Sequence, residues 1–376
     1  MASSTHHLPN PYGTTAAPPP TPSTQPNPLP SSAAAADVLS RMLHRLPPTL
    51  SLPTRLSPPP TTTTTSPPLI FLSPQNPTLL TDVLSASSQF GFFHLTNHSI
   101  SPQLARSAES DSLSLFTLSN DQKQIHFPKN WPLGFNCDDN EDDDETRSDS
   151  FCFDSACSPE STELSLSSLR EFTREMEKVG LEVVEALSCA VGFVNPVRED
   201  PTRVRSLMWI SEGSPGNTPA RFYPYVVGLE YQIRCRKYSL LADSGWISDS
   251  PRVDSILVTL GDIAQVWTNG KIKKVRGRPV PSFEDNNNNA HCISMSLLVT
   301  LPLESIVSPL LPKLTVNNGE EDNQLNKEDN DDNGDTSADT KEDGAFKFNS
   351  FSFEDYAWRI YHERLLLKDP LARYRI

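Results

Sequence analysis

Hydrophobic positions in the first half of the chain recur mainly at helical spacing. Between 164 and 191, apolar side chains return every three or four residues, with one longer step, and charged residues lie mostly off that stripe. This spacing predicts a long amphipathic helix over 164–191. Weaker patterns predict two shorter helices and two strands, the helices over 81–89 (with Thr81 as N-cap) and 102–118 and the strands over 69–72 and 90–100.

The pattern changes to strands from about residue 203. Short apolar or alternating runs follow one another there, with turn residues between them at close intervals. The predicted strands span 207–210, 220–223, 231–235, 256–260, 264–267, 272–276 and 292–300. Asn269-Gly270 is a strong hairpin signal between the strands over 264–267 and 272–276. This spacing of strands predicts a β-sandwich or barrel.

Low-complexity segments flank and interrupt these elements. Residues 1–66 are mostly Pro, Ser, Thr and Ala, a composition that predicts disorder, except for a short amphipathic helix over 36–46 that would dock on the body of the chain. Residues 138–145 carry seven acidic side chains, and residues 317–344 carry eleven acidic side chains against two lysines. These two runs account for the net charge of −15, so the folded part is near neutral. We interpret them as solvated surface loops, with recruitment of a basic partner as the alternative.

Composition also limits the cellular compartment in which we expect the protein and the partners that it can have. The six cysteines form no Cys-x-x-Cys pair, which favours free thiols in a reducing compartment. The first 36 residues contain no Lys or Arg, so a secretory or mitochondrial leader is not expected; a plastid transit peptide is the weaker alternative. No apolar run approaches the roughly 20 residues that span a bilayer. We therefore expect a cytoplasmic or nuclear protein that does not enter membranes.

The basic run from Lys271 to Arg278 has two interpretations. It could bind nucleic acid, but it lacks interleaved aromatic residues and alternates between two faces. A solvated edge strand fits it better, so nucleic acid is not expected as a partner.

Two motifs resemble one known family. Residues 257–278 resemble the run "GD-x-x-Q-x-W-[ST]-NG-[KR]-x-K-x-V-x-H-R" of the plant 2-oxoglutarate/Fe(II)-dependent dioxygenases, and residues 90–100 resemble their element "G-F-F-x-[LV]-x-N-H-G-[IV]". Gibberellin-oxidase-like and other isopenicillin N synthase-like enzymes are the most similar in character. The resemblance implies an α+β fold with a double-stranded β-helix (jelly-roll) core flanked by helices. In that family the histidine matching His98 is structural.

The same resemblance implies a division of the chain. We expect a disordered segment over 1–66, a helical N-terminal subdomain over 67–200 and the double-stranded β-helix over 201–312. An acidic insert over 313–350 and a closing C-terminal helix over 351–376 would follow.

The chain departs from the family at its metal site. The family binds iron through His-x-Asp and a distal histidine, yet none of the eight histidines here has an acidic residue two positions later. Gly277 stands at the distal histidine position. Arg221–Tyr225 resembles the strand before His-x-Asp, and Val227–Tyr231 resembles the strand after it, which suggests deletion of the ligand-bearing hairpin. We assign no catalytic residue and no metal ligand.

The co-substrate site is altered too. The arginine of the family's "R-x-S" clamp for 2-oxoglutarate is replaced by Cys292, and only Ser294 remains. Tyr223 and Ser294 match residues that contact 2-oxoglutarate in the family; core packing and a satisfied hydroxyl are the blander interpretation.

Two functions remain open from the sequence. The first is a non-catalytic descendant, without Fe(II) or 2-oxoglutarate, kept as a scaffold that binds a small molecule or a protein. The alternative is an oxidoreductase acting on a small hydrophobic plant metabolite, gibberellin-like, through a rearranged metal site. That site would draw its ligands from Asp243, Asp254, His291 or a cysteine.

Overall fold

The structure is a computed structural model of the 376-residue chain. It describes residues 63–64, 67–136, 149–157, 164–213, 223–234, 237–281, 292–310, 347–363 and 369–376. The chain divides into two units, Met1–Ser57 and Pro58–Ile376, and all described residues belong to the second. The predicted helix over 36–46 and both acidic runs lie outside the described residues.

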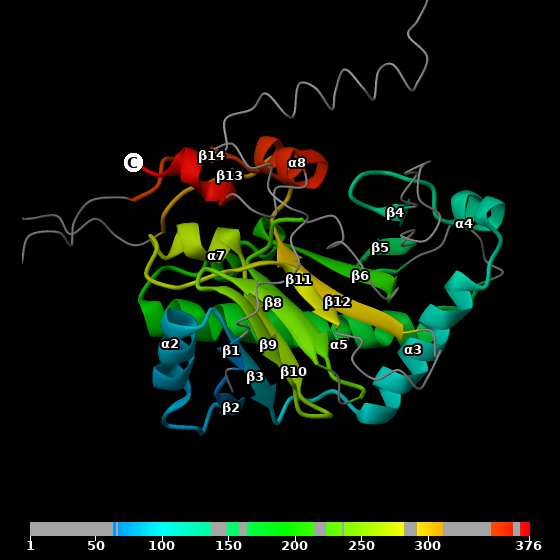
Figure 1. The fold of residues 1–376 in the computed structure, drawn as a ribbon, viewed down its shortest axis with the longest axis horizontal. Helices are drawn as coiled ribbons and strands as arrows, with labels where there is room; N and C mark the ends of the chain where they lie inside the picture. The colour runs from blue at the N-terminus through cyan, green and yellow to red at the C-terminus, as the bar shows by residue number, and fades with distance from the viewer. Residues whose placement is uncertain are drawn as a thin grey trace, which may run out of the picture. The chain divides into compact units, whose positions relative to one another are not determined.

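Helices and strands are mixed along the described unit (Figure 1). The helices are α2 (Leu79–Gln89), α3 (Pro102–Phe116), α4 (Asn120–His126), α5 (Ser167–Val191), α6 (Pro196–Glu199), α7 (Asp262–Trp267) and α8 (Phe353–Glu363), with 3₁₀ turns at Pro201–Arg203 and Pro370–Tyr374. The strands are β1 (Thr63–Thr64), β2 (Leu69–Phe71), β3 (Phe92–Thr96), β4 (Gly134–Asn136), β5 (Ser150–Asp154), β6 (Arg205–Gly213), β7 (Val227–Tyr231), β8 (Tyr238–Ala242), β9 (Gly245–Asp249), β10 (Ile256–Leu260), β11 (Val275–Pro281), β12 (Cys292–Thr300), β13 (Ile306–Val307) and β14 (Phe351–Ser352).

Two sheets form the core. The larger has eight strands in the order β2-β3-β10-β7-β12-β6-β5-β4, and the smaller has four in the order β1-β9-β8-β11. Apolar side chains from β3 and β10 pack against side chains from β8, β9 and β11, so the sheets face each other. A buried pair, His94 Nε2 and Asp249 Oδ2 at 2.7 Å, also joins β3 to β9. The predicted α+β architecture with facing sheets is therefore present.

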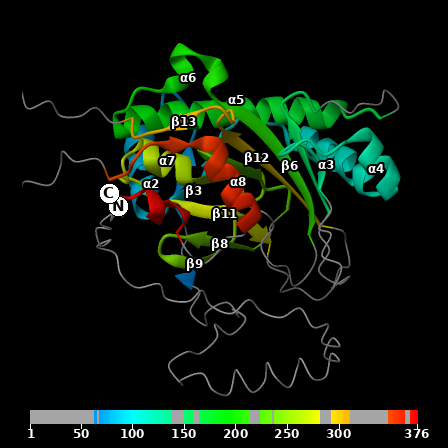
Figure 2. The same cartoon turned by 90° about the horizontal axis from the view of Figure 1, so that it is seen from above.

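The long helix predicted over 164–191 is α5, which begins at Ser167. It packs against β7 and β12 of the larger sheet, where a Cβ on Gly180 would lie 2.7 Å from Val299 and 2.9 Å from Leu229. Glycine at this point lets the helix approach the sheet closely. Figures 1 and 2 show α5 running across the sheet as its longest helical neighbour. The helix ends at Gly192, whose φ of +89° is the left-handed conformation that suits glycine.

The segment 264–267 is a helix and not the predicted strand. Asp262–Trp267 forms α7, and every one of its side chains is buried. A helix buried on all sides shows no amphipathic period, so its apolar run cannot be told from a strand by pattern. Asn269 and Gly270, with φ of 50° and 76°, then turn the chain from α7 into β11 instead of joining two strands. Val266 is buried as expected, but on this helix.

Other boundaries also differ from the prediction. The strand expected over 231–235 is β7, four residues earlier, and the strand expected from residue 272 begins at Val275. Thr81 does not cap α2: the N-cap is Thr78, whose carbonyl accepts a hydrogen bond from the Thr81 hydroxyl at 2.7 Å. Strands β8 and β9 were not predicted, although Tyr238, Leu240 and Ala242 alternate inward along β8.

The carboxyl end of the chain packs back onto the core. Lys274 is wholly buried, and its Nζ lies 2.6 Å from Asp262 Oδ1 and 2.6 Å from Asp369 Oδ1. Arg375 also contacts Asp369, at 2.8 Å. The basic run before and within β11 does lie at a sheet edge, but the prediction that it is solvated is wrong for Lys274, because two carboxylates balance its charge in the interior.

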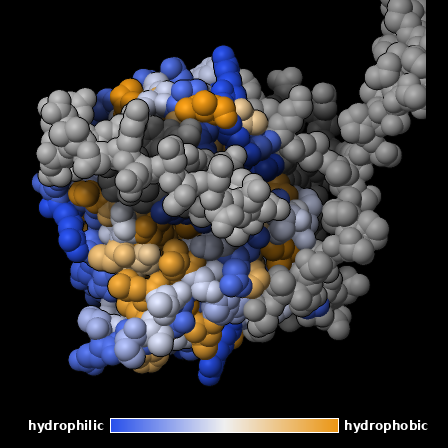
Figure 3. Space-filling view, turned by 90° about the vertical axis from the view of Figure 1, so that its left-hand side faces the viewer, coloured by the Kyte–Doolittle hydropathy of each residue, from blue (hydrophilic) through white to orange (hydrophobic). Residues whose placement is uncertain are grey.

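One face carries exposed apolar side chains. Leu69 and Phe71 of β2, about half exposed, and Leu80 and Leu84 of α2 are among the exposed large hydrophobic residues. Figure 3 shows one side of the molecule, on which apolar residues gather among polar ones. Within the described residues, no helix combines the length and apolar character needed to cross a membrane.

Candidate functional site

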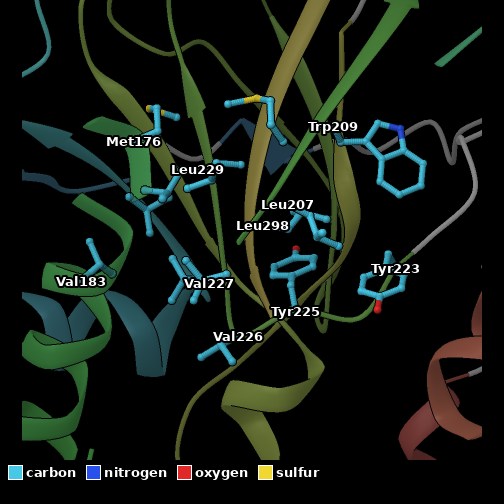
Figure 4. Close-up of a cluster of buried hydrophobic side chains, with 14 of the residues drawn as sticks. Met176, Val183, Leu207, Trp209, Tyr223, Tyr225, Val226, Val227, Leu229 and Leu298 are labelled. Carbon is cyan, nitrogen blue, oxygen red and sulfur yellow. The ribbon is translucent and has the colours of Figure 1, made fainter. Parts of the chain in front are cut away.

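Gly277, the predicted ligand position, lies on β11 opposite a buried tyrosine. The hydroxyl oxygen of Tyr225 lies 2.8 Å from the Gly277 carbonyl oxygen and 3.1 Å from the Val275 carbonyl oxygen, so the phenol donates its proton between two backbone acceptors. Tyr225 is 2% exposed. Figure 4 shows its ring among Leu207, Val227 and Leu298 in the barrel core. Gly277 itself has a φ of +72°, a conformation that disfavours any side chain at this position.

Tyr223 lies two residues earlier in the same buried cluster. Its ring contacts Trp131 at 5.8 Å and Phe353 of α8 at 6.0 Å between centroids. Burial raises the pKa of Tyr223 and of Tyr225 well above the usual value of a phenol. Both tyrosines are therefore protonated at any physiological pH.

Ser294 lies on β12 and binds a carboxylate that belongs to the chain. Its Oγ donates to Glu230 Oε1 at 3.2 Å, and the Oγ of Ser296 donates to Glu230 Oε2 at 3.2 Å. Glu230 lies on β7, is 3% exposed, and also accepts a hydrogen bond from Tyr238. The predicted co-substrate residue Ser294 is thus a satisfied hydroxyl, and no contact joins it to Tyr223 within the described residues.

Arg278 brings a positive charge to the same cluster. Its guanidinium carbon lies 4.7 Å from the ring centroid of Trp209, and its Nη1 donates to Ser211 Oγ at 3.4 Å. Burial lowers the pKa of Arg278 to about 10, against the opposing effect of Glu230, so the side chain is charged at neutral pH. Although the whole residue is only half-buried, its guanidinium packs on the indole ring. The expectation of a solvated strand therefore fails here too.

Asp243 and Asp254, the described residues among those considered for a rearranged metal site, each contact other groups. Asp243 accepts hydrogen bonds from Gln265 Nε2 at 2.9 Å and from the Lys274 amide at 3.2 Å. Asp254 accepts from the Tyr231 hydroxyl, and its carbonyl oxygen lies 3.0 Å from His98 Nε2. Among the described residues, no three His, Cys, Asp or Glu side chains are grouped so as to hold a metal ion. His291 lies outside the described residues, as do the side chains of Cys292 and Cys235.

Sequence reasoning missed three residues of this site: Tyr225, Glu230 and Arg278. The sequence carried a signal for Tyr225 and for Glu230. Tyr223-Pro-Tyr225 has the same spacing as His-x-Asp, and Glu230 is an isolated acid within an apolar strand, which predicts a buried polar partner. Arg278 could not be found by alternation, because the register of β11 against β8 shifts between Arg276 and Val280.

We expect the substitution Tyr225→Phe to lower the free energy of unfolding by about 1–2 kcal/mol, because it leaves two buried carbonyl oxygens without their donor. Tyr223→Phe is the matched control, since it keeps the ring contacts with Trp131 and Phe353. Urea denaturation of both variants measures the difference. Equal losses would show that the Tyr225 hydroxyl contributes nothing particular to this site.

Comparison with known proteins gives matches over most of the chain. The family model described as "non-haem dioxygenase in morphine synthesis N-terminal" matches residues 67–169. Gibberellin 2-beta-dioxygenase 2 of Arabidopsis thaliana is 24% identical over 275 residues, which cover 62% of this chain and 75% of that protein. Gibberellin 2-beta-dioxygenase 3 of the same plant is 23% identical over 261 residues, covering 61% and 74%.

Solved structures match the fold. JOX2, crystallised in complex with 2OG, Fe and JA, superposes with a TM-score of 0.59 at 16% identity, covering 89% of this chain and 97% of that one. The dioxygenase for auxin oxidation (DAO) in rice superposes with a TM-score of 0.58 at 16% identity, covering 82% and 99%. The predicted double-stranded β-helix with flanking helices is confirmed by these likenesses.

Proposed function

We propose that the chain is a non-catalytic member of the 2-oxoglutarate/Fe(II)-dependent dioxygenase superfamily and retains the fold as a binding scaffold. One observation carries the proposal: a buried phenol faces the Gly277 ligand position. A glycine offers no ligand atom from its side chain, and the protonated tyrosine opposite it already donates to the backbone there.

The tyrosines also suggest how the metal ligands were lost. In the family, His-x-Asp lies beside the distal histidine, because all three side chains bind one ion. In this chain the segment that reaches Gly277 is Tyr223-Pro-Tyr225, which has the same i, i+2 spacing and leads directly into β7. This geometry favours substitution of both ligands by tyrosine over deletion of a hairpin, our first interpretation.

Fe(II) and 2-oxoglutarate, the family's cofactor and co-substrate, do not fit the side chains described here. Metal ligands must be deprotonated to bind, and burial keeps both phenols protonated. The remaining serine of the co-substrate clamp, Ser294, is already bonded to Glu230. We therefore derive no oxidation step for this chain.

The packed interior favours a protein partner over a small molecule inside the barrel. The space lined by Gly228, Glu230, Leu257 and Ser296 is too small to hold a water molecule. A ligand the size of 2-oxoglutarate would have to displace these side chains. The scaffold would accordingly act through its surface.

We expect the purified protein to contain iron far below one atom per chain and to leave 2-oxoglutarate undecarboxylated when Fe(II) and ascorbate are added. Elemental analysis and succinate release measure the two quantities, with a gibberellin 2-beta-dioxygenase as positive control. Equimolar iron that is lost on mutating Asp243, Asp254 or His291 would instead support the alternative, an active oxidoreductase on a gibberellin-like metabolite with a rearranged metal site.

A further inference from the structure

A cluster of polar side chains in the barrel interior surrounds the Glu230 carboxylate. Its two oxygens receive hydrogen bonds from different serines, Ser294 on Oε1 and Ser296 on Oε2, each at 3.2 Å. Tyr238 donates a third hydrogen bond from the opposite sheet. Hydroxyl donors from two strands thus converge on one anionic group, an arrangement that resembles a binding site for a free carboxylate.

The side chain of Arg278 brings a positive charge to the cluster. Burial raises the pKa of Glu230, and the hydrogen bonds from Tyr238, Ser294 and Ser296 together with the charge of Arg278 oppose that rise. Arg278 is held over Trp209, so its guanidinium has few alternative positions. The charge of Glu230 raises the pKa of Arg278 and so opposes the lowering effect of burial. Glu230 and Arg278 line the same space in the barrel, which places a positive charge near this carboxyl group.

We infer that the barrel interior contains a carboxylate-binding site that the chain fills with its own Glu230 side chain. Truncating that side chain would open a space lined by Ser294, Ser296, Tyr238 and Arg278 that accepts a small free carboxylate such as formate or acetate. This inference goes beyond the proposed function, because it concerns the cluster whether or not the chain is an enzyme. The iron measurement above therefore succeeds or fails independently of it.

Thermal unfolding of the full-length Glu230→Ala variant tests the site. We expect its Tm to fall by roughly 6 °C or more, because the charge of Arg278 loses its partner. Sodium formate or acetate should recover part of that loss, whereas sodium chloride at equal ionic strength and neutral acetamide should not. The Tm of the wild-type protein should respond equally to all four solutes, since its site is filled.

Two further variants separate anion binding from cavity filling. Leu298→Ala opens an apolar space in the same wall of the barrel and should gain nothing from acetate. Adding Ser296→Ala to Glu230→Ala should abolish most of the recovery, because a donor to the bound carboxylate is lost. Equal recovery by acetate and acetamide, or recovery of Leu298→Ala by acetate, would overturn the inference.

If Glu230→Ala does not fold in any solute, a double-mutant cycle on Glu230 and Arg278 tests the inference instead. Glu230→Gln keeps the volume and removes the charge, and Arg278→Met removes the opposing charge at similar length. We expect Glu230→Gln to lower the Tm strongly when Arg278 is present and only weakly in the Arg278→Met background. Equal losses in both backgrounds would show that the two groups are not paired.

Discussion

Replacing Lys274 by methionine is expected to lower the free energy of unfolding by about 3–5 kcal/mol, the usual cost of breaking a buried ion pair from one side. The ammonium is wholly buried and lies 2.6 Å from both Asp262 Oδ1 and Asp369 Oδ1. Methionine keeps the volume of the stem but leaves two carboxylates without a shared cation. Urea denaturation of the two proteins measures the loss.

The ion pair between Lys274 and Asp369 also predicts that the stability of the protein depends on pH. Burial opposes ionisation of Asp369, but the charge and hydrogen bond of Lys274 outweigh it and lower the pKa of Asp369 below its ordinary value. A group whose pKa is lower in the folded state than in the unfolded state stabilises the protein at pH values above the unfolded pKa, here about 3.9. This stabilisation is lost as the pH falls through the pKa of the folded state. The difference between wild type and Lys274→Met should therefore shrink on acidification below about pH 4.

Lys178→Met on α5 is the matched control. Lys178 forms an ion pair with Glu175 on the helix surface, where its side chain is 64% exposed. Such exposed pairs contribute at most about 1 kcal/mol. If Lys178→Met cost as much as Lys274→Met, the buried position of Lys274 would not be the cause of its contribution.

The triple variant Tyr223→His, Tyr225→Asp, Gly277→His should bind Co(II) or Fe(II), while Gly277→His alone should remain metal-free. A single imidazole cannot hold either ion against water, whereas two histidines and one carboxylate are the set that non-haem iron requires. Losing only a hydrogen-bond partner of a metal ligand lowers metal affinity about 10–100-fold. The triple variant gains two more ligands than Gly277→His, so its metal affinity should be higher by more than about tenfold.

Visible absorption of added Co(II) reports coordination without any need for activity. Histidine at position 277 must adopt a φ near +72°, so Gly277→His should also lower the free energy of unfolding by about 1–2 kcal/mol. If the triple variant folds yet binds no more Co(II) than Gly277→His, Tyr223 and Tyr225 do not stand at the ligand positions, and deletion of the hairpin becomes the better account.

Elements whose pattern is set locally were predictable from the sequence. The stripe of α5 and the apolar runs of β10 and β12 follow directly from periodicity, and the structure places these elements within a few residues of expectation. Helix α7 was not predictable in this way, because burial on all sides erases the polar face that distinguishes a helix.

The site was predictable only in part, and for a different reason. The absence of His-x-Asp and the glycine at position 277 could be read from single positions. The interior cluster could not, because Glu230, Ser294 and Arg278 come from three separate strands and meet only through the register of two sheets. The role of Tyr225 was equally unpredictable, because it depends on a hydrogen bond to Gly277, which lies 52 residues later in the chain.

The contact between Lys274 and Asp369 has a consequence for how the protein is made. Asp369 lies 95 residues beyond its partner in the sequence. During synthesis β11 leaves the ribosome long before Asp369 does, so Lys274 then has only Asp262 to balance its charge. The core can therefore close fully only after the segment that carries Asp369 has also left the ribosome.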